Sequence, residues 1–192
     1  MQNREPGSEA RPGNNIQDGI NPLARAECCA EALHEILRIA IGAAQADFGT
    51  VHQYNSIEDC LRVVASYGFP DQALSLFQIV RRDTNSTCAA TLKQRMRTIV
   101  GNIAASYLFV GTSELGALQR AGVAAAHSTP IIVDDGLLWG VLTVHFREPL
   151  RDADYDPTPM ERVATRFAEC LKESPTTLFP DRDTGTSGHL HV

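Results

Sequence analysis

Polar side chains interrupt the most apolar stretch of this chain, residues 123–146, and they are the groups best suited to chemistry. They are His127, Ser128, Thr129 and His145. A polar group inside an apolar segment raises the free energy of the folded state unless it has a hydrogen-bond partner. These groups therefore either pair with one another and with the backbone, or face a pocket. In a pocket, imidazole and hydroxyl groups would bind a small molecule.

Strand alternation adds two further candidates to this set. It predicts that Trp139, Thr143 and His145 share one face of a strand, while the more uniformly apolar residues between them share the other. We expect the apolar face to meet helices and the mixed face to meet a pocket. There Trp139 could stack on a planar ligand. The plainer alternative is a hydrogen-bonded core histidine beside a structural tryptophan.

Cys88 is the candidate nucleophile. It follows Ser86-Thr87, which is typical of a helix start, where the helix dipole and free N–H groups lower the pKa of a thiol. The chain has five cysteines in irregular spacing and no C-x-x-C pair. Free thiols in a reducing compartment are the expected state.

Two tyrosines and a group of arginines complete the candidates. Tyr67 and Tyr107 could line the pocket, although packing would explain them equally well. Arginines at 81, 82, 95 and 97 form a modest basic region. They could attract an anion such as nitrate or a carboxylate, or be a solvated surface.

The elements that would position these residues can be read from hydrophobic periodicity. Spacings of three and four predict helices over 22–44, 113–121 and 158–171, and β-formers predict strands over 48–54 and 60–67. A hairpin is expected within 123–146, turning at Asp135-Gly136. Shorter pieces complete the list: helices at 71–77 and from 86, and strands at 79–80 and 97–100.

This order of elements predicts an α/β (α+β) fold with a mostly antiparallel central sheet. The two terminal helices would lie on one face, and the irregular middle segment would cover a pocket on the other. Residues 21–173 would form a single domain, between disordered tails at 1–20 and 174–192.

The overall charge and hydropathy exclude several partner classes. The net charge of −6 disfavours nucleic acid, and no apolar run is long enough to span a membrane. The N-terminus lacks the apolar core of a signal peptide. We therefore expect a cytoplasmic protein.

Residues 43–171, about two thirds of the chain, resemble a GAF domain, most closely those of bacterial sensor histidine kinases. The matching pieces are Ala46–Val51, Leu61–Pro70, Ser86–Ala90, Ile99–Ile103, His127–Ile131 and Gly136–Phe146. The resemblance implies the fold above and a sensory module that binds a small molecule. It leaves the ligand open, because family members bind cyclic nucleotides, tetrapyrroles, haem, small anions or nothing known. We do not expect haem or a bilin here.

The resemblance also implies the partners and two alternatives. No output domain is expected after residue 171, so a signal would pass to a sensor kinase or other signalling protein, or through a homodimer interface. One alternative is a redox enzyme similar to the free methionine sulfoxide reductases, with Cys88 as its thiol. The absence of cysteine between 100 and 122 weakens it, since a second thiol is needed. The other is a ligand-free module for dimerisation.

Overall fold

The computed structural model describes residues 22–133, 136–151 and 154–173. The expected tails at 1–20 and 174–192, and Asp135 of the expected turn, lie outside the described residues. The neighbouring Gly136 has φ +78°, a left-handed conformation that glycine adopts without steric cost.

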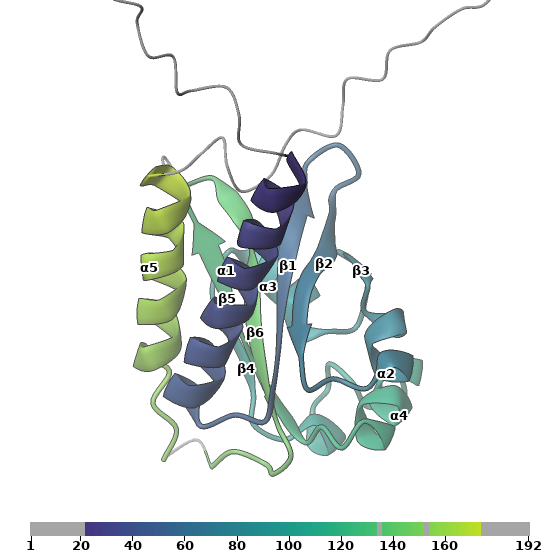
Figure 1. Cartoon of the computed structure of the whole chain (residues 1–192). Coiled ribbons are helices and arrows are strands. Elements are labelled where there is room, and N and C mark those ends of the chain that lie inside the picture. The colour runs from purple at the N-terminus through teal and green to yellow at the C-terminus, as the bar shows by residue number, and fades with distance from the viewer. Residues whose placement is uncertain (1–21, 134–135, 152–153, 174–192) are drawn as a thin grey trace, which may run out of the picture.

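A six-stranded sheet forms the centre of the molecule (Figure 1). Its strands are β1 (Phe48–Asn55), β2 (Cys60–Tyr67), β3 (Ile79–Arg81), β4 (Thr98–Val100), β5 (Ala125–Ile132) and β6 (Leu138–Phe146). Their order is β3-β2-β1-β6-β5-β4, and every neighbouring pair is antiparallel. The predicted antiparallel sheet is confirmed, and its central strands β1 and β6 are those buried on both faces.

Two helices cover one face of the sheet (Figure 1). α1 (Pro22–Ala44) turns Leu37 and Ala40 toward the sheet, and α5 (Thr158–Glu173) contributes Met160 and Phe167. These side chains join Val51 in one buried cluster. The expected packing of the terminal helices on one face is confirmed, and it uses the apolar stripe of α1.

Short helices and loops cover the opposite face. They are α2 (Asp71–Leu76), α3 (Thr87–Gln94), the 3-10 helix η1 (Ile103–Ala105) and α4 (Ser113–Arg120). Their side chains form a second buried cluster with Leu61 of β2 and Val141 of β6. The sheet therefore separates two cores, one beneath the terminal helices and one beneath the short helices and loops.

The starts of α4 and α5 lie where the periodicity predicted them, and each has a local polar contact. The α4 cap is Thr112, whose hydroxyl accepts from the Leu115 N–H. α5 begins at Thr158, whose N–H donates to Asp156 Oδ1, and Glu161 pairs with Arg97. The ion pair between Glu161 and Arg97 ties the first turn of α5 to the segment before β4.

Candidate functional site

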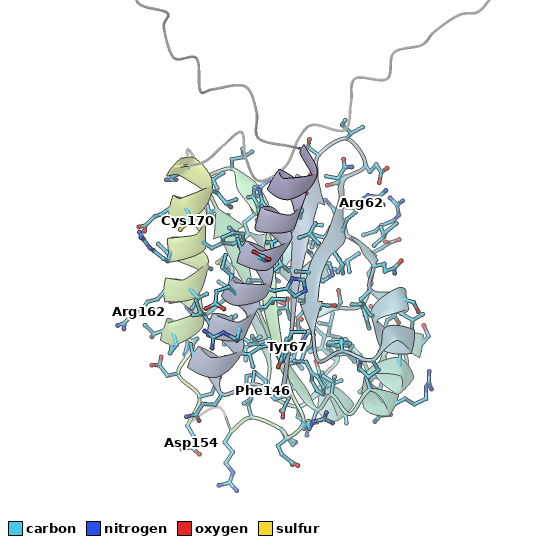
Figure 2. The ribbon with its side chains drawn as sticks, viewed as in Figure 1. Arg62, Tyr67, Phe146, Asp154, Arg162 and Cys170 are labelled. Carbon is cyan, nitrogen blue, oxygen red and sulfur yellow. The ribbon has the colours of Figure 1, made fainter. Side chains whose placement is uncertain are left out.

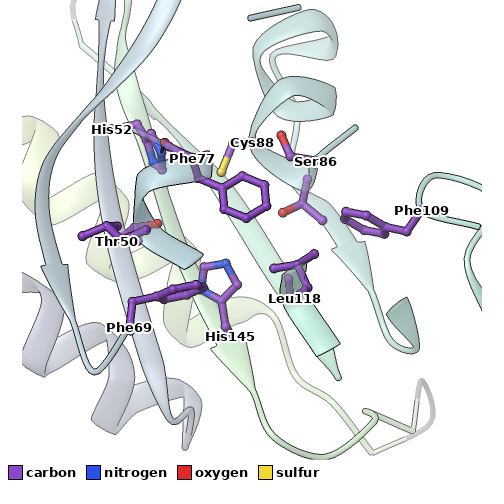
Figure 3. Close-up of a pocket in the computed structure, with 12 residues that line it drawn as sticks. Thr50, His52, Phe69, Phe77, Ser86, Cys88, Phe109, Leu118 and His145 are labelled. Atoms are coloured by element: carbon purple, nitrogen blue, oxygen red, sulfur yellow. Dashed lines mark hydrogen bonds between the residues drawn. The ribbon is translucent and has the colours of Figure 1, made fainter. Parts of the chain in front are cut away.

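A small cavity lies between the sheet and the short helices (Figure 3). Its free volume is about 20 Å³. Its apolar wall consists mainly of Phe69, Leu74, Phe77, Phe109 and Leu118. Its polar side chains are Thr50, His52, Ser86, Thr87, Cys88 and His145. β1, β6 and the N-terminal turn of α3 thus present polar groups to one largely apolar space.

Three polar atoms of this cavity are buried without a hydrogen-bond partner. They are Thr50 Oγ1, His52 Nδ1 and His145 Nδ1. The three side chains are between 1% and 7% exposed, and Figure 3 shows all three turned toward the same space. An unpartnered buried polar atom destabilises the fold by about 1–3 kcal/mol. Three of them in one cavity form a ready set of contacts for a bound molecule.

The tautomer of His52 follows from its one partner. Its Nε2 lies 3.0 Å from the carbonyl oxygen of Phe77, which can only accept, so Nε2 carries the proton. Burial lowers the pKa of His52 to about 4, and the ring is neutral at pH 7. Nδ1 therefore offers an acceptor lone pair to the cavity.

His145 is held neutral by the same cause. Burial lowers its pKa to about 3, and the nearby His52 contributes to this lowering, because two positive rings would repel each other. The edge of the His145 ring meets Phe69 at 4.7 Å between ring centroids. His145 faces the pocket side of the sheet, as expected. That it binds a ligand is a proposal.

Hydroxyl groups form a network beside the cavity. Ser128 Oγ donates to Thr87 Oγ1 at 2.7 Å and lies 2.8 Å from Thr143 Oγ1. The Cys88 Sγ atom lies 3.2 Å from Thr143 Oγ1. Ser128 and Thr143 therefore face the expected side of the sheet. They support the cavity residues Thr87 and Cys88, and their own hydroxyls already have partners.

Cys88 lies in the first turn of α3, as predicted, but its thiol is not activated there. Burial raises the pKa of Cys88, and hydrogen bonds from Thr143 and Ser128 lower it only in part. The expectation of a lowered pKa is wrong, because the desolvation of a fully buried thiolate outweighs the helix dipole. Cys60 is not among the residues lining the cavity and contacts Glu58.

His127 and Thr129 lie on the opposite face of the sheet from the cavity. The ring of His127 bonds the hydroxyl of Tyr155 through Nδ1 at 2.7 Å and Thr129 Oγ1 through Nε2 at 3.0 Å. Burial lowers its pKa to about 4. Alternation explains the error: Ser128 lies on the cavity side of the sheet, so both of its neighbours must point to the other side. His127 is the hydrogen-bonded core histidine of the plainer alternative.

Trp139 also lies on the helix face, against Phe167 of α5 at 5.1 Å between ring centroids. The expected pocket orientation is wrong because β6 carries a bulge. Ile131 pairs with Gly140 and Ile132 pairs with Leu138, so Trp139 is an extra residue that no β5 residue opposes. The bulge reverses the alternation at this end of the strand.

The remaining predicted residues lie outside the cavity lining. Tyr107 is 96% exposed, and Tyr67 is 52% exposed at the end of β2 (Figure 2). Arg82 pairs with Asp59, and Arg97 pairs with Glu161. The arginines thus form surface contacts, which favours the solvated-surface interpretation over capture of an anion.

Sequence reasoning missed Thr50 and His52. Both belong to β1, and their spacing of two residues places them on one face together with Phe48. This polar pair in a strand buried at five successive positions was the available signal. Phe69 and Phe77 were also missed, because only the chain path around α2 brings them to the cavity.

Within the described residues, no three or more His, Cys, Asp or Glu side chains are grouped so that they could hold a metal ion. In the same part of the chain, no helix has the length and apolar character to cross a membrane.

Comparison with known proteins gives a family match. The model of the GAF domain family matches residues 30–171. No curated protein matches the sequence significantly.

Several solved structures share the fold. One is a domain of a putative two-component sensor histidine kinase from Sinorhizobium meliloti, with TM-score 0.59 and 18% identity over 74% of this chain and 90% of that one. The GAF domain region of a putative membrane protein from Geobacter sulfurreducens gives TM-score 0.63 and 14% identity over 79% and 97%. A type II free methionine-R-sulfoxide reductase from Thermoplasma acidophilum gives 0.59 and 9% over 78% and 96%. At these identities the likeness concerns the fold alone.

Proposed function

The chain belongs to the GAF domain family, and on this premise we propose that it is a sensory module that binds a small molecule in the cavity beneath α2, α3 and α4. GAF domains are typically sensing or regulatory modules. Residues 21–173 would act as one domain. The cavity side chains His52, His145 and Thr50 would make the polar contacts, with Cys88 beside them.

One observation carries this proposal: the unpartnered buried polar atoms of the described residues all belong to this single cavity. Random packing faults would scatter through both cores. A site that keeps three such atoms together gives up stability for binding, since a ligand can satisfy all of them at once.

The link from the cavity to the terminal helices supports a signalling role. The carbonyl of His145 accepts from the Asp47 N–H at 3.0 Å, and Asp47 follows the end of α1 by three residues. The Arg147 N–H in turn donates to Asp47 Oδ2 at 2.8 Å. A shift of β6 caused by a ligand at His145 would therefore reach the end of α1 through main-chain contacts.

We propose that this movement passes to a signalling protein such as a sensor kinase, or to a second copy of the chain, in the cytoplasm. Cys60, Cys88 and Cys170 are free thiols, as a reducing compartment favours. A homodimer would place α1 and α5 at its interface. Sedimentation at several concentrations tests the dimer, and a constant monomer mass would remove it.

Native mass spectrometry of gently purified protein tests the binding function. We expect an added mass on each chain, lost from the His145→Ala variant. His127→Gln is the matched control, because it changes a buried histidine on the other face of the sheet and should keep the added mass. Loss from both variants, or a bare wild-type chain under every purification, would contradict the proposal.

A redox enzyme is the second candidate, because Cys88 lines the cavity and a sulfoxide reductase shares the fold. The raised pKa of Cys88 stands against it. Turnover of free methionine sulfoxide with a thiol reductant, abolished by Cys88→Ala, would replace the sensor by the enzyme. A ligand-free dimerisation module is the third candidate, and a bare chain that is dimeric would favour it.

A further inference from the structure

Charge and hydrogen-bond direction in the cavity narrow the class of ligand. We infer that the bound molecule is uncharged and planar and donates a hydrogen bond from an N–H or O–H group to His52 Nδ1. This inference rests on the proposed function and adds the chemical class of the ligand to it.

The cavity lining carries no charge that could balance a charged ligand. Among the described residues that line the cavity there is no Asp, Glu, Lys or Arg. Its three titratable side chains, His52, His145 and Cys88, are all neutral at pH 7, because burial opposes the charged form of each. An ion placed there would lose its water shell without gaining a counter-charge, which is strongly unfavourable.

Arg147, which packs on an aromatic neighbour of the cavity wall, does not supply such a counter-charge. The guanidinium of Arg147 lies over the Phe48 ring at 4.4 Å from its centroid and pairs with Asp47. Phe48 in turn packs against Phe69, at 5.5 Å between ring centroids, which separates this arginine from the cavity wall. The Phe48 and Phe69 rings therefore lie between the Arg147 guanidinium and the cavity.

The hydrogen-bonding state of His52 requires a donor on the ligand. Because the Nε2 proton of His52 faces the Phe77 carbonyl, Nδ1 can only accept. A ligand that presents only acceptors, such as an ether or a nitrate ion, would face a lone pair with a lone pair. A donor satisfies it, and the hydroxyl of Thr50 can then serve as donor or acceptor to the same molecule.

The aromatic walls of the cavity favour a flat ligand. Phe69, Phe77 and Phe109 line the cavity together with the two imidazole rings, and the free volume is small. Aromatic walls favour flat molecules that can lie against a ring face or edge. Amides, ureas and small N–H heterocycles combine a flat shape, zero charge and a donor.

Three planar molecules of four heavy atoms test the class directly: urea is neutral, nitrate is an anion and guanidinium is a cation. Each is titrated at non-denaturing millimolar concentration into the whole chain, stripped of any bound molecule and labelled with ¹⁵N in its histidine rings. We expect urea to shift the His52 Nδ1 and His145 signals saturably, and the two ions to leave them unchanged at equal concentration. His52→Leu should weaken the effect of urea at least tenfold, and His34→Gln, on the exposed side of α1, should leave it unchanged.

Each other outcome decides the inference. Saturable shifts with nitrate or guanidinium and none with urea would overturn the charge assignment while leaving the cavity a binding site. No shift with any probe would overturn the inference, and the added mass in native mass spectrometry would show separately whether the proposed function stands. If His52→Leu does not fold, the size of the His52 Nδ1 shift in the wild-type chain decides, because accepting a hydrogen bond moves this ¹⁵N signal far less than gaining a proton does.

Discussion

Thr50 is the residue that most clearly separates function from stability in this molecule. Its hydroxyl is buried in β1 and has no partner, so it lowers the stability of the fold in the absence of a ligand. Thr143, on the neighbouring strand and directly opposite in register, has its hydroxyl bonded to Ser128 and lies close to Cys88. The same residue type thus stands in two contrasting situations on adjacent strands.

Thr50→Val should therefore stabilise the ligand-free protein by about 1 kcal/mol, because it removes an unsatisfied hydroxyl at constant shape. Thr143→Val should destabilise it by about 1–3 kcal/mol, because it leaves Ser128 short of a partner. Urea unfolding of stripped protein measures both. Equal losses in the two variants would mean that Thr50 Oγ1 has a partner in solution.

The burial of Cys88 should limit the reactivity of its thiol. Its raised pKa and its burial should make it react slowly with iodoacetamide at mildly alkaline pH, well after the exposed Cys170 (Figure 2). Peptide mass spectrometry during a time course measures the order. Labelling of Cys88 before Cys170 would contradict the buried, protonated thiol and would revive the redox enzyme.

At the scale of elements, most of the fold could be predicted from the sequence. α1, β1 and β2 lie where periodicity placed them, because long amphipathic or β-branched segments carry a strong signal. The exceptions have local causes. The 3-10 helix η1 has three residues and carries no periodic signal, and its start is fixed by Asn102 accepting from the Ala104 N–H.

The candidate site could be predicted only in part. Cys88 and His145 follow from strand alternation and the helix start. The bulge at Trp139 and the orientation of Ser128 toward the cavity side decide which residues face the helices, and both depend on pairing between strands. That Trp139 points toward the helices could not be predicted from the sequence of one strand alone.

The close approach of β1 and β6 beside the bulge makes Gly140 irreplaceable. A Cβ atom at this position would lie 2.2 Å from the carbonyl oxygen of His52 on the adjacent strand, and a backbone atom cannot rotate away. Gly140→Ala should lower the free energy of unfolding by about 3 kcal/mol, the upper end for overpacking, and shift His52 within the cavity. Gly42→Ala is the control, because a Cβ atom added there would meet nothing within 4 Å, and it should be neutral or stabilising. Equal denaturation midpoints for the two variants would contradict the tight β1–β6 contact.

At the scale of the whole molecule, three buried neutral histidines couple stability to pH. Folding lowers the pKa of His52 and His127 to about 4 and that of His145 to about 3, from 6.5. Below pH 6.5 the unfolded chain binds protons that the folded chain excludes, so their contribution is fully present above pH 6.5 and is lost as the pH falls toward 4. The lowered pKa values of Glu35, Glu58 and Asp59 act below this window.

We expect the free energy of unfolding to fall between about pH 6.5 and 5, with each histidine contributing up to about 1.4 kcal/mol per pH unit. Denaturant unfolding at half-unit steps measures the slope. His52→Gln should remove roughly a third of this slope. A flat profile in this window would show that the rings are protonated or solvated in the folded state.

The unpartnered polar atoms and two of the three buried histidines meet at the cavity, so we expect the cavity to hold a molecule. The crystal structure of gently purified protein tests this most directly. We predict density for a flat molecule within hydrogen-bond distance of His52 Nδ1, with Thr50 Oγ1 and His145 Nδ1 partnered by it or by ordered water. A cavity closed by Phe69 and Phe77, or filled by water alone in protein that was never stripped, would contradict the account.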